Sequence, residues 1–258
     1  MRPPEAEALR LRPSSGPAVS AHQGGSERTA PATREAYEDA VAAGADYAEL
    51  DVRRTADGVF VVHHDARVCG DGPPLSTLTH AELCARAGRP VPVVEEILQL
   101  IAGRLLAHLD LKETGHEREL IDRAVALLGP DGFVATTLED RSVAAITAAF
   151  PGVRTGLSLG RDRRDVPRGR LLATRLGRAA AHAPGARLRR RRDRRAPPAA
   201  RAGVLREAAR HGLFTMVWTV NDDPLMRTFL ADPRVDVLIT DRPRRALQLR
   251  AHTRTPTG

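Results

Sequence analysis

From residue 18 onward, short apolar runs alternate with longer segments in which apolar residues recur every three or four positions. Short runs are typical of buried strands, and the longer spacing is typical of amphipathic helices. The pattern predicts strands over 18–22, 47–52, 59–65, 105–111, 133–137, 153–159, 214–220 and 235–241. It predicts helices over 34–44, 93–104, 117–129, 141–150, 202–212 and 223–231.

Repeated strand and helix units of this kind predict a mainly parallel sheet covered by helices. With so many units in one chain, the α/β class narrows to a single-domain, closed (β/α)₈ TIM barrel over residues 18–247. Residues 1–17 are rich in Pro and Arg and lack periodicity, so we expect a disordered lead-in there. We expect residues 248–258 to be a flexible tail.

Residues 66–90 form a long excursion after a strand that ends in His and Asp. We expect a loop with one short helix. Because such an excursion follows the carboxyl end of a strand, where a barrel places its active site, we predict an active-site loop insertion. The alternative is a tolerated surface insertion, and length alone does not separate the two.

Residues 187–201 break the alternation, because they contain eight Arg and almost no apolar side chains where a barrel strand is due. The segment accounts for nearly all of the net charge of +8. It fits a solvated basic loop, a polyanion-binding patch or a local frame error in the gene. We favour the frame error because the pattern is intact on both sides, and we then expect one disrupted strand.

The composition agrees with a folded cytoplasmic protein. Among 258 residues, 42% are hydrophobic, which excludes wholly disordered and collagen-like chains. The two cysteines, Cys69 and Cys84, are too few for a disulfide framework. Because no apolar run reaches the length of a spanning helix and residues 1–17 lack an apolar stretch, we expect neither a membrane span nor a secretory signal. Because the surface outside 187–201 is nearly neutral, we expect no nucleic-acid partner. The sequence does not indicate an oligomeric state.

Acidic side chains gather on two of the predicted strands. Glu49 and Asp51 are two residues apart, so both project from the same face, and Asp110 and Lys112 repeat this spacing. On apolar barrel strands that face is the interior, where neighbouring carboxylates repel each other unless a cation or a proton intervenes. Three oxygen ligands, from Glu49, Asp51 and Asp110, would suit Mg²⁺ or Ca²⁺. The alternative is a structural ion-pair network.

Histidines lie at the ends of two other predicted strands. His22 precedes Gln23 and two glycines, whose backbone could approach a ligand or form a plain turn. His63 and His64 face opposite sides, and the spacing does not decide which one points inward. His22 and His64 together would supply two groups that titrate near neutral pH, as acid–base hydrolysis requires.

Several motifs together resemble a known family. They are AHQGG, APAT, GADYAELDVRRTADGVFVVHHD, VPVVEEIL, LDLKE, VWTVND and LITDRP. In order and spacing they are similar to the glycerophosphodiester phosphodiesterases, which are metal-dependent (β/α)₈ barrels. The resemblance covers roughly residues 18–245, except about 160–203.

This resemblance implies metal-dependent hydrolysis of a small-molecule glycerophosphodiester to glycerol 3-phosphate and an alcohol. It implies the following roles: metal ligands Glu49, Asp51 and Asp110; an acid–base pair, His22 and His64; and substrate-binding residues Lys112, Trp218 and Gln23. Lys112 would bind a phosphate oxygen, and Trp218 would wall the glycerol pocket. All but one of the 40 basic residues are Arg, and Lys112 is the exception. Because an ammonium is a compact point charge, Arg is a poor substitute there.

The chain departs from the family pattern at three points. Gln23 stands where the family usually has Arg, and Asp110 stands where it usually has Glu. Pro31-Ala32-Thr33 is one residue shorter than the Pro-Glu-Asn-Thr segment that the family usually has, and it lacks the Glu. Two alternatives therefore stay open. One is a related phosphodiesterase with a lipid substrate, which exposed apolar residues on 66–90 would favour. The other is an inactive descendant that binds polyanions through its Arg-rich segment.

Overall fold

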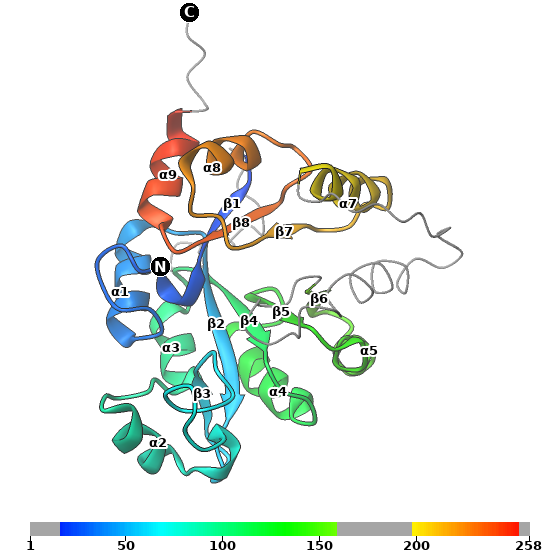
Figure 1. Ribbon diagram of the computed structural model, residues 1–258. Helices are drawn as coiled ribbons and strands as arrows, with labels where there is room; N and C mark the ends of the chain where they lie inside the picture. The colour runs from blue at the N-terminus through cyan, green and yellow to red at the C-terminus, as the bar shows by residue number, and fades with distance from the viewer. Residues whose placement is uncertain (1–15, 159–197, 253–258) are drawn as a thin grey trace, which may run out of the picture.

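The structure, a computed structural model, describes residues 16–158 and 198–252 (Figure 1). Its strands are β1 (Ala18–Ala21), β2 (Tyr47–Arg54), β3 (Phe60–Val62), β4 (Leu106–Leu111), β5 (Phe133–Thr137), β6 (Arg154–Leu157), β7 (Met216–Val217) and β8 (Val237–Thr240). Its helices are α1 (Arg34–Ala43), α2 (His80–Ala87), α3 (Val94–Ile101), α4 (Glu117–Leu128), α5 (Asp140–Ala149), α7 (Pro198–Arg210), α8 (Asp223–Leu230) and α9 (Pro243–His252), with 3₁₀ turns η1 (His22–Gly24) and η2 (Leu75–Thr77).

The strands form one curled sheet with helices on its outer side (Figure 1). The hydrogen-bonded order is β6-β5-β4-β2-β1-β8-β7, and every neighbouring pair along it is parallel. This architecture confirms the prediction of a single-domain, TIM-barrel-like (β/α)₈ fold. Over the described residues the sheet is a half-barrel with β6 and β7 at its two edges, and its predicted closure is not shown. Residues 159–197, which lie between β6 and α7 in the sequence, are outside the described residues. The disrupted strand expected at 187–201 falls mostly there and stays a prediction, while from Pro198 the chain is α7.

Alternate residues of the strands face two different cores. Tyr47 on β2 and Leu106 on β4 belong to a cluster inside the curl of the sheet, with Ala18, Val134, Val237 and Ile239. Leu50 and Leu109 belong to the larger cluster between the sheet and the helices. Since side chains alternate along a strand, Glu49 and Asp51 share the inward face with Tyr47. Sequence parity had predicted this orientation.

The chain turns back after β2 at Asp57-Gly58, a pair that is typical of tight turns. Gly58 has a φ of +84°, which a non-glycine residue rarely adopts. The turn pairs β3 antiparallel to β2, with Val52 opposite Val62. β3 therefore lies off the parallel path and brings the residues after it to the carboxyl end of β2.

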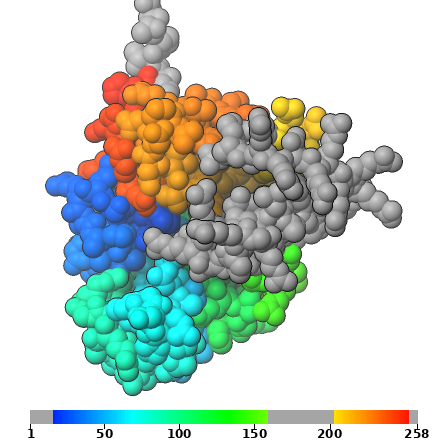
Figure 2. All heavy atoms as spheres, viewed as in Figure 1, coloured from blue at the N-terminus to red at the C-terminus, as the bar shows by residue number. Residues whose placement is uncertain are grey.

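The segment 66–90 carries one short α-helix, α2, as expected, together with the turn η2. Its larger apolar residues are buried in a separate cluster with Val61 of β3 and Val91; the members from the segment are Val68, Leu75, Leu78 and Leu83. The segment belongs to the lower end of the molecule in Figures 1 and 2, where α2 and the cyan atoms lie. No large apolar side chain of 66–90 is exposed, so the feature that would favour a lipid substrate is not found there.

The helix α9 extends through residues 248–252, which we had expected to be part of a flexible tail. Leu249 packs in the core with Val19 and Leu238, and this burial holds the last turns of the helix in place. Residues 253–258 and the lead-in 1–15 lie outside the described residues. Within 16–158 and 198–252, we find no helix with the length and apolar character needed to cross a bilayer.

Candidate active site

Three carboxylates meet at the carboxyl end of two neighbouring parallel strands. The register places Asp51 on β2 opposite Asp110 on β4, and Glu49 lies one inward position before Asp51. One carboxylate oxygen from each of the three residues lies within 4.8 Å of the others. Glu49 and Asp51 are only 3% and 1% exposed. The structure therefore brings together the three residues that the sequence had proposed as metal ligands.

The charges of this cluster are unevenly compensated. Burial, reinforced by the charge of Asp51, raises the pKa of Glu49 well above its usual range. Burial also acts to raise the pKa of Asp51, but the Lys112 ammonium and His64 outweigh it and lower that pKa. Lys112 Nζ lies 2.7 Å from Asp51 Oδ1 and also pairs with Asp110. Glu49 thus carries the least compensated charge of the three.

Gln23 joins this cluster through two hydrogen bonds. Its backbone N–H donates to Glu49 Oε2 at 2.8 Å, and its side-chain Nε2 donates to Asp51 Oδ2 at 2.6 Å. The side chain at the position where the family usually has Arg therefore contacts the carboxylates. A neutral amide holds Asp51 without adding a positive charge.

The glycines after Gln23 serve close packing. A Cβ on Gly24 would lie 2.8 Å from Ala36 of α1, and one on Gly25 would lie 3.0 Å from Pro243. The Gly25 N–H donates to His22 O at 2.7 Å, so this donor is already used. These contacts favour the turn interpretation of the two glycines over a backbone anion site.

His22 forms a dyad with Asp241, which directly follows β8. His22 Nδ1 lies 2.6 Å from Asp241 Oδ1, and Asn221 Nδ2 donates to Asp241 Oδ2 at 2.5 Å. Asn221 Oδ1 in turn accepts from the Asp241 backbone N–H at 3.0 Å. Burial acts to lower the pKa of His22, but the hydrogen bond to Asp241 and the charges of Glu49, Asp241 and Asp51 raise it to about 9. At neutral pH His22 is protonated.

His64 is the histidine of the pair whose charge is found to act on the carboxylate cluster. His64 contributes to the lowered pKa of Asp51, and its Nδ1 lies 2.8 Å from Asp65 Oδ1. His63 Nδ1 lies 2.9 Å from the Asp65 backbone oxygen. Burial, with small contributions from Arg53 and Arg89, lowers the pKa of His63. The effect on Asp51 favours His64 over His63 as the residue near the cluster.

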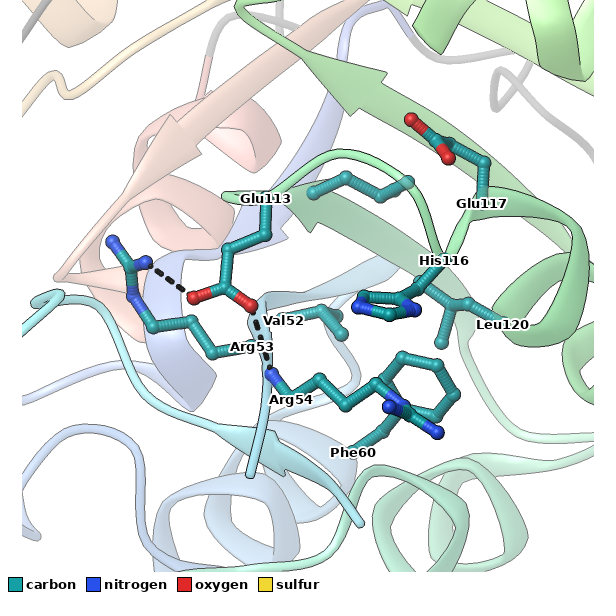
Figure 3. Close-up of a pocket in the computed structure, with 9 residues that line it drawn as sticks. Val52, Arg53, Arg54, Phe60, Glu113, His116, Glu117 and Leu120 are labelled. Atoms are coloured by element: carbon teal, nitrogen blue, oxygen red, sulfur yellow. Dashed lines mark hydrogen bonds and ion pairs between the residues drawn. The ribbon is translucent and has the colours of Figure 1, made fainter. Parts of the chain in front are cut away.

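An ion pair ties the backbone of His64 to the loop after Lys112. Arg53 Nε donates to His64 O at 2.9 Å, and Arg53 Nη1 donates to Glu113 Oε1 at 3.0 Å. Glu113 Oε2 also accepts from the Arg54 backbone N–H at 3.2 Å, as Figure 3 shows. The carboxyl ends of β2 and β4 are thus linked beside a small hollow that Phe60 helps to line.

Two further polar residues lie on the inward face of the sheet beside Asp110: His108, one inward position earlier on β4, and Thr136 on β5, opposite Asp110. His108 is 4% exposed, and its Nε2 lies 2.8 Å from Thr136 Oγ1. The Thr136 hydroxyl donates to Asp110 Oδ1 at 2.7 Å. Burial lowers the pKa of His108 to about 4, so this imidazole is neutral at physiological pH.

Trp218 follows β7 directly and is 45% exposed. It precedes Asn221 by three residues, so its segment leads to the partner of Asp241. The Trp218 side chain is therefore largely open to solvent beyond the carboxyl end of β7.

A protein-family model described as the glycerophosphoryl diester phosphodiesterase family matches residues 22–245. The chain belongs to this family. The match confirms the family, and with it the enzyme class, that the sequence motifs had indicated. No curated protein matches the chain significantly.

Solved structures of similar fold carry related names. A glycerophosphodiester phosphodiesterase from Parabacteroides distasonis has a TM-score of 0.70 at 19% identity, with 93% of this chain and 99% of that one covered. One from Thermotoga maritima has a TM-score of 0.67 at 20% identity, covering 90% and 98%. An Oleispira antarctica phosphodiesterase in complex with the product sn-glycerol-3-phosphate has a TM-score of 0.64 at 18% identity, covering 92% and 97%. At these identities the likeness concerns the fold.

Sequence reasoning missed Asp241, Asn221, His108 and Thr136 as members of the site. A usable signal was present for Asp241, because it is an acidic residue directly after an apolar strand. His108 shares the inward face with Asp110, two residues away. No local signal marks Thr136, because only the strand register places it opposite Asp110.

Proposed function

We propose that this chain hydrolyses glycerophosphodiesters to glycerol 3-phosphate and an alcohol, with Mg²⁺ or Ca²⁺ bound by Glu49, Asp51 and Asp110. The observation that carries the proposal is the convergence of three carboxylate oxygens within 4.8 Å, in a member of this family. The His22–Asp241 pair and Lys112 lie beside the same three carboxylates.

The cluster fits a divalent cation. Its donors are all oxygens, which Mg²⁺ and Ca²⁺ prefer. The pKa of Glu49 is raised because the group is buried beside the negative charge of Asp51, and a bound cation would offset that charge. When bound, the metal would act as a Lewis acid that polarises a phosphoryl oxygen and stabilises charge developing in the transition state.

The two histidines suit opposite proton transfers. With Nδ1 bonded to Asp241, His22 holds its exchangeable proton at Nε2 and is protonated at neutral pH, so it suits the general acid that protonates the departing alkoxide. His64, with Nδ1 directed to Asp65, suits the general base through Nε2. The nucleophile it activates is water or the glycerol hydroxyl of the substrate, the second route passing through a cyclic phosphate.

Lys112, Trp218 and Gln23 complete the proposed substrate site. Lys112 would place an ammonium against a phosphate oxygen while it stays near Asp51 and Asp110. Trp218 would pack its ring against the glycerol carbons. Gln23 would hold Asp51 in place and leave the site with one cation fewer than the family pattern has.

Lys112→Arg tests the need for a compact cation. We expect kcat/KM to fall at least about tenfold although the charge is kept, because a planar guanidinium does not fit between Asp51 and Asp110 as an ammonium does. Steady-state kinetics on glycerophosphocholine would measure this, with Arg54→Lys as a matched exchange at a residue outside the cluster. Full activity of Lys112→Arg would remove Lys112 from the proposed site.

Asp241→Asn tests the origin of the raised His22 pKa. As a general acid, His22 would lose its proton as the pH rises, so activity would decline through an alkaline limb at or below pH 9. Without the Asp241 charge that pKa falls, and we expect the limb to move to lower pH. The kcat/KM profile between neutral and alkaline pH would show it. If the alkaline limb stays at the same pH in Asp241→Asn, the group that titrates in the pH profile is not the His22–Asp241 pair.

The products of hydrolysis test the proposed function itself. Purified protein would be incubated with glycerophosphocholine, lysophosphatidylcholine and sphingomyelin in the presence of Mg²⁺ or Ca²⁺, and products followed by ³¹P NMR. We expect glycerol 3-phosphate from glycerophosphocholine and slower turnover of both lipids. Preferred cleavage of a lipid would favour the phosphodiesterase with a lipid substrate. If no substrate is cleaved and the protein binds polyanions in a salt-sensitive way, the inactive, polyanion-binding descendant is favoured.

A further inference from the structure

A chain of hydrogen-bonded polar groups, of which His108 is buried and Thr136 and Asp110 are half-buried, links β4 and β5 at Asp110. Thr136 on β5 lies directly opposite Asp110 on β4, and its hydroxyl donates to Asp110 Oδ1 at 2.7 Å. His108, one inward position before Asp110, reaches the same hydroxyl through Nε2 at 2.8 Å. All three side chains share the inward face of the curled sheet.

The direction of this chain follows from its donors. A threonine hydroxyl has one proton, and here Asp110 accepts it. The Thr136 oxygen must therefore accept from His108, which fixes His108 as the tautomer with its proton on Nε2. Nδ1 of His108 is then an acceptor, and it is buried without a hydrogen-bond partner among the described residues.

A buried acceptor without a hydrogen-bond partner, such as His108 Nδ1, destabilises the fold. A functional role of the hydrogen-bond chain at Asp110 would account for keeping it. The chain is directed at one oxygen of Asp110, whereas Oδ2, the other oxygen, faces Lys112. With Oδ1 fixed, the plane of the carboxylate is set. A short aspartate side chain is thereby held in one orientation beside Asp51.

We propose that Thr136 and His108 are positioning residues for the metal: their hydrogen-bond chain orients the Asp110 carboxylate toward Glu49 and Asp51. The inference rests on the proposed function, because it requires that Asp110 bind a cation. Partners that orient a ligand in this way commonly affect metal affinity by about 10–100-fold.

The test is metal affinity, measured by isothermal titration calorimetry with Mg²⁺ and Ca²⁺ on metal-free protein. Thr136→Val keeps the shape but removes the hydroxyl, and we expect it to bind the ion about 10–100-fold more weakly than the parent. Thr136→Ser restores the hydroxyl and should return most of the affinity. A merely structural Thr136 would change the melting temperature and leave affinity unchanged.

A second variant guards against a failure of Thr136→Val to fold. His108→Phe removes the donor that polarises the Thr136 hydroxyl and should weaken binding in the same direction, and circular dichroism would verify folding of each variant. Parent-like affinity in a folded Thr136→Val or His108→Phe protein would overturn the inference while the metal site stands. If the parent binds no ion, the proposed metal site itself fails, and the positioning role falls with it.

Discussion

Replacing Glu49 with glutamine is expected to lower kcat/KM for glycerophosphodiester hydrolysis by about 10³-fold or more and, in metal-free protein at neutral pH, to raise the melting temperature. The activity falls because a metal ligand is lost, and a bound metal contributes several kcal/mol of transition-state stabilisation. The stability rises because Glu49 is buried beside Asp51 and its pKa is raised. A carboxyl group with a raised pKa disfavours folding once the pH exceeds its unfolded value, and glutamine removes that effect.

Asp51→Asn is the matched control, since it should abolish activity equally but shift stability the other way. The pKa of Asp51 is lowered by Lys112 and His64 despite its burial, so its charge stabilises the fold above its unfolded pKa. Thermal melts with EDTA would measure both variants, and each kcal/mol corresponds to about 2–4 °C for a chain of this size. A lower melting temperature for Glu49→Gln would contradict the electrostatic argument, and retained activity in either variant would contradict the ligand assignment.

The second large effect is expected from the two histidines, and it depends on the leaving group. His22→Ala should lower kcat by about 10²–10⁴-fold on glycerophosphocholine, since the departing alkoxide then lacks its acid. A p-nitrophenyl diester leaves without protonation, so the same variant should lose far less on that substrate. His64→Ala should be impaired equally on both substrates, because a general base acts on the nucleophile. Steady-state kinetics of both variants on the two substrates would measure the contrast.

Both histidine variants should still bind the metal, because neither residue is a proposed ligand. Calorimetric titration with Mg²⁺ or Ca²⁺ serves as the control. If His64→Ala instead recovers on the p-nitrophenyl substrate, the two roles are exchanged. Two variants with parent-like activity would remove both histidines from the mechanism.

The sequence predicted those parts of the fold and site that depend on local pattern. The inward direction of Glu49, Asp51 and Asp110 follows from strand parity, and the turn at Asp57-Gly58 follows from local backbone preference. Parity could not decide between His63 and His64, because both lie beyond the last residue of β3. In the folded chain the charge of His64 acts on Asp51, which favours His64, while both histidines contact Asp65.

The residues that sequence analysis missed depend on contacts between distant segments. Asp241 is 219 positions from His22, and Thr136 is 26 positions from Asp110. Only the order of strands in the sheet brings these pairs together. The glycines after Gln23 were ambiguous for the same reason, since the neighbours that require them, Ala36 and Pro243, are set by tertiary packing.

The most direct test of the proposed metal-dependent mechanism is a metal titration of activity. Protein freed of metal with EDTA would be assayed on glycerophosphocholine while Mg²⁺ or Ca²⁺ is added, and ion binding would be measured in parallel. We predict no turnover without metal, and activity that rises in step with the occupancy of one site per chain. Turnover in metal-free protein at the saturated rate would contradict the central role of the three carboxylates.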